Sequence, residues 1–142
     1  MDVPFFGGCA CGAVRYECSA APVAMVNCHC RDCQRAGGAG FSPTVVVPAG
    51  SFRLLRGKPK RYSLTADSGH TARRAFCGDC GAPLFASSSA RRDFIGVRAG
   101  SLDDPSGFKP QAEVWTVSAQ PWDHLGADVP HFPRGRERTG DA

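Results

Sequence analysis

Eight cysteines are the residues of this chain best suited to chemistry, and seven of them fall into three short clusters. The clusters are Cys9-x-Cys11, Cys28-x-Cys30-x-x-Cys33 and Cys77-x-x-Cys80. Residues two apart in an extended segment point to the same face, and a tight turn brings the two sulfurs of C-x-x-C together. Gly81, after the last cluster, can take the positive φ that such a turn needs. These spacings are typical of zinc ligands.

The clusters divide into two sites with different properties. The first and third offer four thiolates, which close a tetrahedral zinc site, whereas the middle cluster offers three and leaves a coordination position free. A closed site stabilises a fold, and an open site can do chemistry. We therefore expect two zinc ions, of which the second is the more labile. The structural ion would be bound by Cys9, Cys11, Cys77 and Cys80, and the labile ion by Cys28, Cys30 and Cys33.

A disulfide framework is the alternative use of eight cysteines. Disulfide density is typical of secreted chains smaller than these 142 residues. The N-terminal sequence MDVPFFGG has neither the basic region nor the apolar run of a secretion signal. Cysteines two or three residues apart are also poor partners for long-range cross-links. The sequence therefore favours metal binding.

Two further residues near the clusters have simpler interpretations. Cys18 alternates with Val14 and Tyr16 in a strand-like run, and we expect it to be a buried apolar thiol. His29 lies between two expected ligands, and a site of three thiolates plus His29 is conceivable. Because neighbours alternate in extended chain, however, its ring should point away from the ion that Cys28 and Cys30 share.

Short strands must position these clusters. Gly, Pro, Asn and Asp punctuate the runs that have strand character. The expected strands span 13–18, 23–28, 44–47, 51–55, 61–64, 71–76, 83–86, 94–97 and 112–117. One short helix is expected over 31–36, where Gly37-Gly38 ends it. The pattern predicts an all-β fold of layered sheets with little helix.

Length and composition suggest a single cytoplasmic domain. A chain of 142 residues is expected to form one domain, which we place at 1–133. Periodicity is lost after Pro121, and residues 134–142 are expected to be a flexible polar tail. No stretch approaches the ~20 apolar residues of a membrane span. We therefore expect no membrane partner and a compartment that keeps thiols reduced.

The net charge is +4, and cations concentrate between residues 53 and 74. The simplest interpretation of such a run is a solvated strand face. The functional interpretation is attraction of a small anionic substrate. Interleaved exposed aromatics are few, so a nucleic-acid partner is disfavoured.

The cysteine motifs and their flanks resemble the glutathione-dependent formaldehyde-activating enzyme family, also called the S-(hydroxymethyl)glutathione synthase family. The likeness covers nearly the whole domain, from about Phe6 to Phe132. The motifs that carry it are Gly8-Cys9-x-Cys11-Gly12-Ala13-Val14, Cys28-His29-Cys30-x-x-Cys33-Gln34-Arg35, Phe76-Cys77-x-x-Cys80-Gly81-x-x-Leu84, Trp115-Thr116, and the stretch from Trp122 through Pro130 to Phe132.

This resemblance implies stacked antiparallel sheets of the β-tent type with zinc knuckles. It implies the same division of ligands, with the second zinc associated with catalysis, so Cys28, Cys30 and Cys33 are the expected catalytic residues. The family reaction joins glutathione and formaldehyde into a hydroxymethyl thiol adduct, which is carbon–sulfur lyase chemistry. Its physical demand is a thiolate at neutral pH, and zinc coordination deprotonates a thiol. We expect zinc to deliver the thiolate rather than to polarise the aldehyde, because three thiolates leave the site with net charge −1.

Glutathione's two carboxylates need cationic partners, and four arginines near the ligand segments are candidates: Arg31, Arg35, Arg73 and Arg74. An exposed arginine without a ligand is the simpler interpretation of each. Two other functions stay open. One is a related thiol or another small aldehyde as substrate. The other is a non-catalytic, zinc-stabilised binding module for protein or nucleic acid, against which the three-cysteine cluster counts because a purely structural site should be closed.

Overall fold

The structure of the protein is a computed structural model that describes residues 1–135. Most of the predicted tail, residues 136–142, lies outside the described residues. The described part has the ten strands β1 (Phe5–Gly8), β2 (Arg15–Cys18), β3 (Ala24–Cys28), β4 (Ser42–Pro48), β5 (Phe52–Arg56), β6 (Lys60–Thr65), β7 (Thr71–Phe76), β8 (Pro83–Ser88), β9 (Phe94–Arg98) and β10 (Ala112–Val114). It has one α-helix, α1 (Arg31–Gly37), and short 3₁₀ turns at Ala49–Ser51, Ala99–Ser101, Pro105–Gly107 and Thr116–Ser118. No helix of this part is long and apolar enough to cross a membrane.

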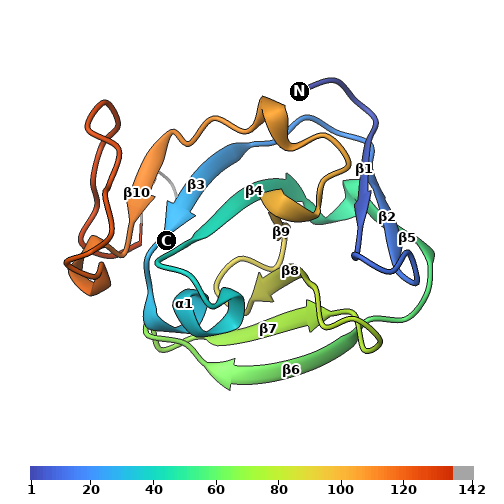
Figure 1. Cartoon of the computed structure of the whole chain (residues 1–142), viewed down its shortest axis with the longest axis horizontal. Coiled ribbons are helices and arrows are strands. Elements are labelled where there is room, and N and C mark those ends of the chain that lie inside the picture. Colours follow the sequence, from blue (N-terminus) through green and yellow to red (C-terminus); the bar gives the residue numbers. More distant parts are fainter. Residues whose placement is uncertain (136–142) are drawn as a thin grey trace.

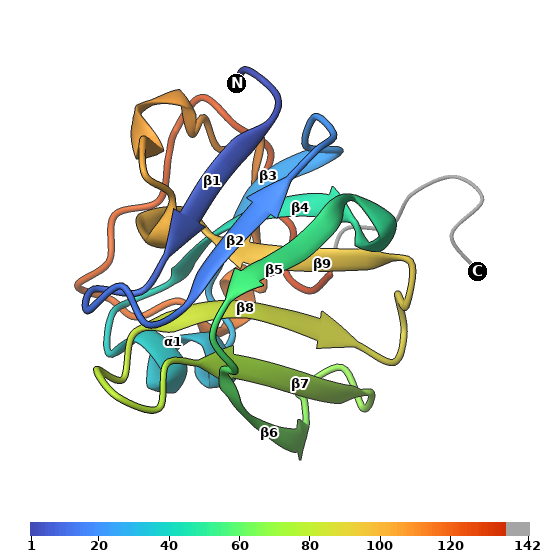
Figure 2. The same ribbon diagram turned by 90° about the vertical axis from the view of Figure 1, so that its right-hand side faces the viewer.

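The strands form two sheets, which confirms the predicted all-β class. The small sheet has the order β1-β2-β5, and the large sheet has the order β10-β3-β4-β9-β8-β7-β6. Neighbouring strands are antiparallel except for β10, which pairs in parallel with β3. Figure 1 shows the small sheet at the right of the molecule and α1 at the lower left. In Figure 2 the small sheet lies in front of the large one.

The register of the large sheet gives it two chemically different faces. Val45 pairs with Val97, Val97 with Phe85, and Phe85 with Ala75. Because side chains alternate along each strand, residues in one such cross-strand row share a face. This row belongs to the hydrophobic core that packs against the small sheet. The neighbouring positions along the same strands must therefore face the opposite side.

The small sheet supplies the other half of the core. Tyr16 is fully buried and stacks on Phe52, with ring centroids 5.2 Å apart, while its hydroxyl lies 2.6 Å from Ser101 Oγ. The hydroxyl is thus satisfied inside an apolar region, as a buried polar group requires. Cys18 is also fully buried, which confirms the prediction, and burial raises the pKa of its thiol to about 12.

Most strands lie where the sequence predicts them, but two regions differ. Strand β1 was not predicted, because Phe5-Phe6-Gly7-Gly8 has no alternation of apolar and polar residues. The expected strand 112–117 ends at Val114, since Trp115 takes a left-handed conformation with φ of 58° and a 3₁₀ turn follows. The predicted helix is confirmed and extends to Gly37.

Two connecting turns, one between β5 and β6 and one between β6 and β7, give the first testable prediction. Gly57 and Gly69 both have positive φ, at +79° and +86°. A Cβ on Gly57 would also lie 2.1 Å from the carbonyl oxygen of Ala13, whereas a Cβ on Gly69 would meet nothing within 4 Å. Gly69→Ala should therefore lower the free energy of unfolding by about 1–2 kcal/mol, from φ strain alone. Gly57→Ala should lower it by about 3 kcal/mol or more, because the backbone must shift as well. Urea unfolding measures both, and equal losses would contradict the close approach at Gly57.

Candidate metal centres and the cavity beside them

Four cysteine sulfurs converge between the two sheets. The Sγ atoms of Cys9, Cys11, Cys77 and Cys80, which we call the four-cysteine site, all lie within 4.8 Å of one another. Cys11 Sγ is 3.6 Å from Cys9 Sγ and 3.7 Å from Cys77 Sγ. A tetrahedral zinc with Zn–S bonds of about 2.3 Å requires sulfurs about 3.8 Å apart. The donor set and its spacing therefore fit zinc.

Two tight turns of similar construction carry these four sulfurs. The turn after β1 is closed by a hydrogen bond of 3.1 Å from Cys9 N to Val14 O, and the turn after β7 by one of 3.0 Å from Cys77 N to Ala82 O. Gly81 has a φ of +79°, the positive value predicted for this turn. Since one turn belongs to the small sheet and the other to the large sheet, the site bridges the two.

Backbone N–H groups surround the sulfurs of the four-cysteine site. Val14 N lies 3.2 Å from Cys9 Sγ, and Asp79 N lies 3.4 Å from Cys77 Sγ. Backbone hydrogen bonds from Ala82 and Cys11 lower the pKa of the exposed Cys80 thiol to about 6. Hydrogen bonds to the charged form favour it, so the turn itself stabilises a thiolate.

The second cluster forms where β3 ends and α1 begins. The Sγ atoms of Cys28, Cys30 and Cys33, the three-cysteine site, lie within 4.8 Å of one another. Cys30 is the N-cap of α1, and its sulfur accepts a hydrogen bond of 3.3 Å from Cys33 N. Cys30 and Cys33 are buried and Cys28 is partly exposed. The end of a strand and the first turn of a helix thus gather three thiols that fit a zinc ion with one position left over.

The electrostatics of the three-cysteine site favour one thiolate, at Cys33, over the other two. Hydrogen bonds from Cys28 and Cys30 hold the pKa of Cys33 well below its ordinary value, and the charges of Arg98 and Arg74 act in the same direction. The same sulfur contacts raise the pKa of Cys28. Cys33 is therefore the first of the three to lose its proton.

Two carboxylates also lie at this site. Cys30 Sγ and a carboxylate oxygen from each of Asp32 and Asp67 lie within 4.8 Å of one another. Asp32 Oδ2 is buried and has no hydrogen-bond partner among the described residues. Asp32 comes from the first turn of α1, and Asp67 from the turn between β6 and β7. Oxygen donors are thus within reach of the site as well as sulfur.

The structure places the four candidate arginines very differently. Arg74 Nη2 lies 3.5 Å from Cys33 Sγ, and the side chain is 8% exposed. Arg73, its neighbour on β7, points to the opposite face of the sheet, as strand alternation requires. Arg31 is exposed and donates a hydrogen bond to Gln34 Oε1. Arg35 is exposed and, together with Arg74, lines a cavity of about 250 Å³.

Arg98 was not predicted, yet it lies beside Arg74 at the three-cysteine site. Its Nη1 donates a hydrogen bond of 2.8 Å to Thr44 Oγ1, and burial lowers the pKa of its guanidinium. Arg74 Nε and Nη1 are buried without a hydrogen-bond partner among the described residues. Because unpaired buried N–H groups are costly, these donors are suited to an incoming anion.

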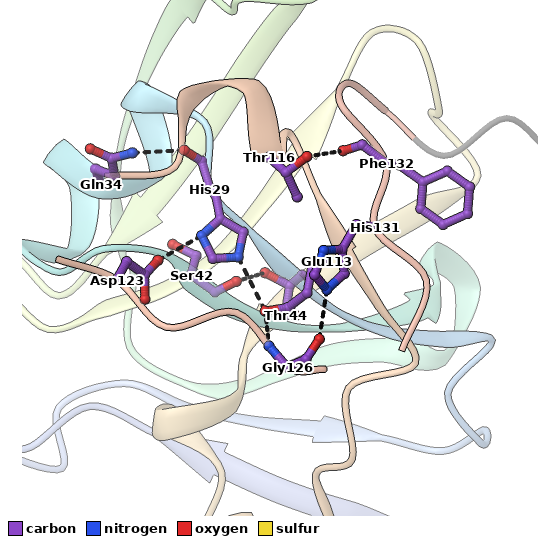
Figure 3. A network of polar contacts seen from close by, with 10 residues as sticks. All are labelled: His29, Gln34, Ser42, Thr44, Glu113, Thr116, Asp123, Gly126, His131 and Phe132. Carbon is purple, nitrogen blue, oxygen red and sulfur yellow. Dashed lines mark hydrogen bonds and ion pairs between the residues drawn. The ribbon is translucent and has the colours of Figure 1, made fainter. Parts of the chain in front are cut away.

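His29 points away from the sulfurs, as expected from strand alternation. Its Nδ1 lies 2.8 Å from Asp123 Oδ2 and its Nε2 lies 3.3 Å from Glu113 Oε1, and all three side chains are nearly or fully buried (Figure 3). The imidazole ring therefore lies between two buried carboxylates, one facing each of its nitrogens.

Further hydrogen bonds in this region join the loop that carries Cys28 and Cys30 to the C-terminal segment. Gln34 Nε2 donates hydrogen bonds of 2.7 Å to His29 O and 2.9 Å to Ser118 O. Gly126 N donates to Glu113 Oε1 at 3.3 Å (Figure 3). Sequence analysis missed Glu113 and Asp123 as partners of His29, since His29 is distant from both in the sequence. Both act as positioning residues for the loop that carries Cys28 and Cys30.

A cavity of about 350 Å³ opens beside the three-cysteine site. All three cysteines line it, together with Arg74 and Arg98. Much of its remaining wall consists of small apolar side chains from β3, β4, β7, β8 and β10. The site is thus the sulfur-rich, polar end of a larger and mainly apolar space.

Comparisons with known proteins agree with this geometry. A family model described as glutathione-dependent formaldehyde-activating enzyme matches residues 4–118, a range that contains both cysteine sites. The crystal structure of a Rhodobacter sphaeroides protein, a target of Northeast Structural Genomics, is similar with a TM-score of 0.59. It shares 22% identity, and the match covers 89% of this chain and 98% of that chain. At this identity, the structural likeness supports the fold alone.

The two cysteine sites should respond differently to loss of a ligand. Cys80 is exposed, so Cys80→Ser removes little packing, yet it should unfold or insolubilise the protein. Structural zinc contributes ~10–16 kcal/mol of apparent binding energy in small peptides, against about 5–15 kcal/mol for a whole domain's stability. Cys30→Ser should leave a folded protein. Thermal unfolding with metal analysis checks this, and comparable losses of stability would contradict separate structural and labile sites.

The buried His29 cluster should carry a large share of the fold's stability. Removing the ring leaves two buried carboxylates without their shared partner, so His29→Asn should cost about 3–5 kcal/mol in urea unfolding. His124→Asn, at an exposed position, is the control and should cost less than about 0.5 kcal/mol. Adding Asp123→Asn to His29→Asn should recover part of the loss. Purely additive losses in the double variant would speak against ionic coupling.

Proposed function

The chain belongs to the glutathione-dependent formaldehyde-activating enzyme family, and from this premise we propose that it joins a thiol, glutathione, to an aldehyde, formaldehyde, at the three-cysteine site. The thiol sulfur bonds to the carbonyl carbon, the C=O π bond opens, and the thiol proton passes to the carbonyl oxygen. The reverse reaction cleaves a carbon–sulfur bond, so the proposed class is carbon–sulfur lyase.

Zinc is the proposed metal at both sites, with two ions per chain. Cys9, Cys11, Cys77 and Cys80 would hold a structural ion, because four thiolates close its coordination. The remaining cluster, Cys28, Cys30 and Cys33, would hold the second and more labile ion. When bound there, zinc supplies a means of keeping a thiol deprotonated at neutral pH.

The arginine pair is the observation that carries the proposal. Three thiolates and a divalent ion have net charge −1, and Asp32 and Asp67 beside Cys30 add to it. Attraction of an anionic thiol therefore depends on the two guanidinium groups that line the cavity, those of Arg74 and Arg98. Arg74 has two buried N–H groups without a partner among the described residues, and a carboxylate of glutathione satisfies donors of this kind.

The other predicted arginines differ in how well they support substrate binding. Arg35 shares the smaller cavity with Arg74, Arg98 and Tyr62, which gives that space several donors for a polar peptide. We propose Arg35 as a second carboxylate partner. Arg31 is engaged with Gln34, and Arg73 faces the other side of the sheet, so neither is included in the proposed site.

The thiols support a reducing compartment such as the cytoplasm. All eight cysteines are free, so the structure supports metal binding rather than a disulfide framework. Thiolate ligands require reduced cysteine, and cytosolic conditions maintain it.

Glutathione and S-methylglutathione provide a direct test by calorimetry on the zinc-loaded protein. Both ligands have two carboxylates, but the methylated one has no thiol, so it should bind at least ten-fold more weakly. Cys33→Ser should abolish this difference. Arg35→Ala should weaken both ligands alike, because it removes only a carboxylate partner.

Arg74 and Arg73 form a matched pair of variants for the same measurement. Arg74→Gln should weaken glutathione binding about ten-fold, the effect of losing one hydrogen bond to a charged group. Arg73→Gln, on the opposite face, should change binding less than two-fold.

Equal affinity for glutathione and S-methylglutathione would refute thiolate binding at the metal. Absence of binding for either would favour a non-catalytic binding module, and formaldehyde addition should be followed against a no-enzyme control.

A further inference from the structure

The cavity wall beside the three-cysteine site is built by strand register. Ala24 pairs with Val46, Val46 with Gly96, Gly96 with Ala86, and Ala86 with Arg74. This row crosses five strands on the face opposite the core, and all five of its residues line the cavity. Val26 on β3 and Val114 on β10 also line the cavity, outside this row, and Val114 pairs with Cys28. This face of the sheet thus carries the three cysteines and the arginines at one end, and mainly small apolar side chains elsewhere.

The size of this space exceeds what formaldehyde requires. A volume of about 350 Å³ corresponds to about a dozen groups of the size of water, at about 30 Å³ each. Formaldehyde has two non-hydrogen atoms. Alanine and glycine at the centre of the wall, where valine or leucine is usual in a sheet, leave the space open. The cavity therefore suits a ligand of several carbon atoms.

Glutathione does not match the wall either. It has two carboxylates, an ammonium group and two peptide bonds, and apolar side chains satisfy none of them. The carboxylates at the three-cysteine site, Asp32 and Asp67, lie beside Cys30 and are not part of the apolar wall. The polar lining groups lie near the three-cysteine site, as Arg74 and Arg98 do, or on the β6–β7 and β8–β9 connections and the end of β8. The smaller cavity, whose lining includes Arg35 and Tyr62, offers cationic and hydroxyl groups to the carboxylates of the thiol.

From size and polarity together we infer that the carbonyl partner of this protein is an aldehyde with an apolar body of about six to eight non-hydrogen atoms, aromatic or aliphatic. This inference rests on the proposed function and specifies its second substrate. The reaction stays an addition: the sulfur–carbon bond forms, the C=O π bond opens, and the thiol proton ends on oxygen. The apolar body lies along the wall and gains the free energy of leaving water.

Binding can be measured apart from chemistry with an unreactive pair of probes. Benzyl alcohol keeps an aromatic body but forms no adduct, and methanol is its small counterpart. In the reduced, zinc-loaded full chain without thiol, benzyl alcohol should produce saturable methyl NMR shifts at Val26, Val46 and Val114. Val45 and Val97 face the core and should not shift, which makes Val45 and Val46 a matched pair of neighbours. Methanol should produce no saturable shift.

Filling the cavity should remove this selectivity. Ala86→Leu places three more carbons against the wall and should weaken benzyl alcohol binding at least ten-fold. With glutathione present, it should lower the ratio of kcat/KM for benzaldehyde to that for formaldehyde by at least ten-fold. Ala72→Leu, on neighbouring β7, provides a second filled variant should the first fail to fold. Ala127→Leu, at an exposed position outside the cavity, should change neither quantity.

The outcomes separate this inference from the proposed function. Accelerated formaldehyde addition with no saturable binding in the cavity overturns the inference and leaves the function standing. Cavity binding without accelerated addition to any aldehyde overturns the proposed reaction, and the assignment to an aldehyde with it. Equal shifts at Val45 and Val46 mean non-specific binding and overturn the inference. A preference for benzaldehyde that Ala86→Leu removes supports it.

Discussion

Four sulfur atoms from two hairpin turns meet at one point, and much of the architecture depends on that meeting. One turn follows β1 in the small sheet and the other follows β7 in the large sheet, so the cysteine cluster sets the distance between the sheets at one end of the molecule. The core sets it elsewhere, through successive ring contacts of Tyr16 with Phe52 and of Phe52 with Phe85. Because the two sheets are joined in this way, the face of the large sheet opposite the core does not have to pack against the small sheet. That face can then carry a polar, reactive site without loss of packing.

The large sheet separates stability from chemistry by alternation alone. Residues 45 and 97 bury their side chains toward the small sheet, whereas residues 46 and 96 open onto the cavity. Arg73 and Arg74 show the same rule at the charged edge, because adjacent arginines on β7 serve opposite faces. A one-residue slip of β7 would exchange the faces of these two arginines and would remove the Arg74 guanidinium from the cavity. The register of this sheet is therefore as important to the site as the cysteine ligands are.

Sequence alone predicts the local features of this molecule well and the distant ones poorly. The cysteine clusters, helix α1 and the orientation of His29 away from the sulfurs follow from spacing over a few residues, and all lie as predicted. Arg98, Glu113 and Asp123 could not be found in this way, because each belongs to the site only through strand pairing or through a segment far along the chain. Arg73 and Arg74 were equal candidates until the register distinguished them. Trp115 ended a predicted strand because its left-handed backbone conformation cannot be deduced from residue type.

The parallel pairing of β10 with β3 has a consequence for the order in which a ribosome can deliver this protein. The four cysteines that join the sheets have all been added once residue 80 is reached, and the hairpins that carry them are local. Cys28, Cys30 and Cys33 are added early too, but β10, which pairs in parallel with β3, and the carboxylates around His29 lie between residues 112 and 126. Until residues 112–126 have been added, the loop that carries Cys28 and Cys30 therefore lacks β10 and the two carboxylates beside His29. The four-cysteine site can therefore form on the nascent chain, whereas the three-cysteine site gains its last supports only after residues 112–126 have been added.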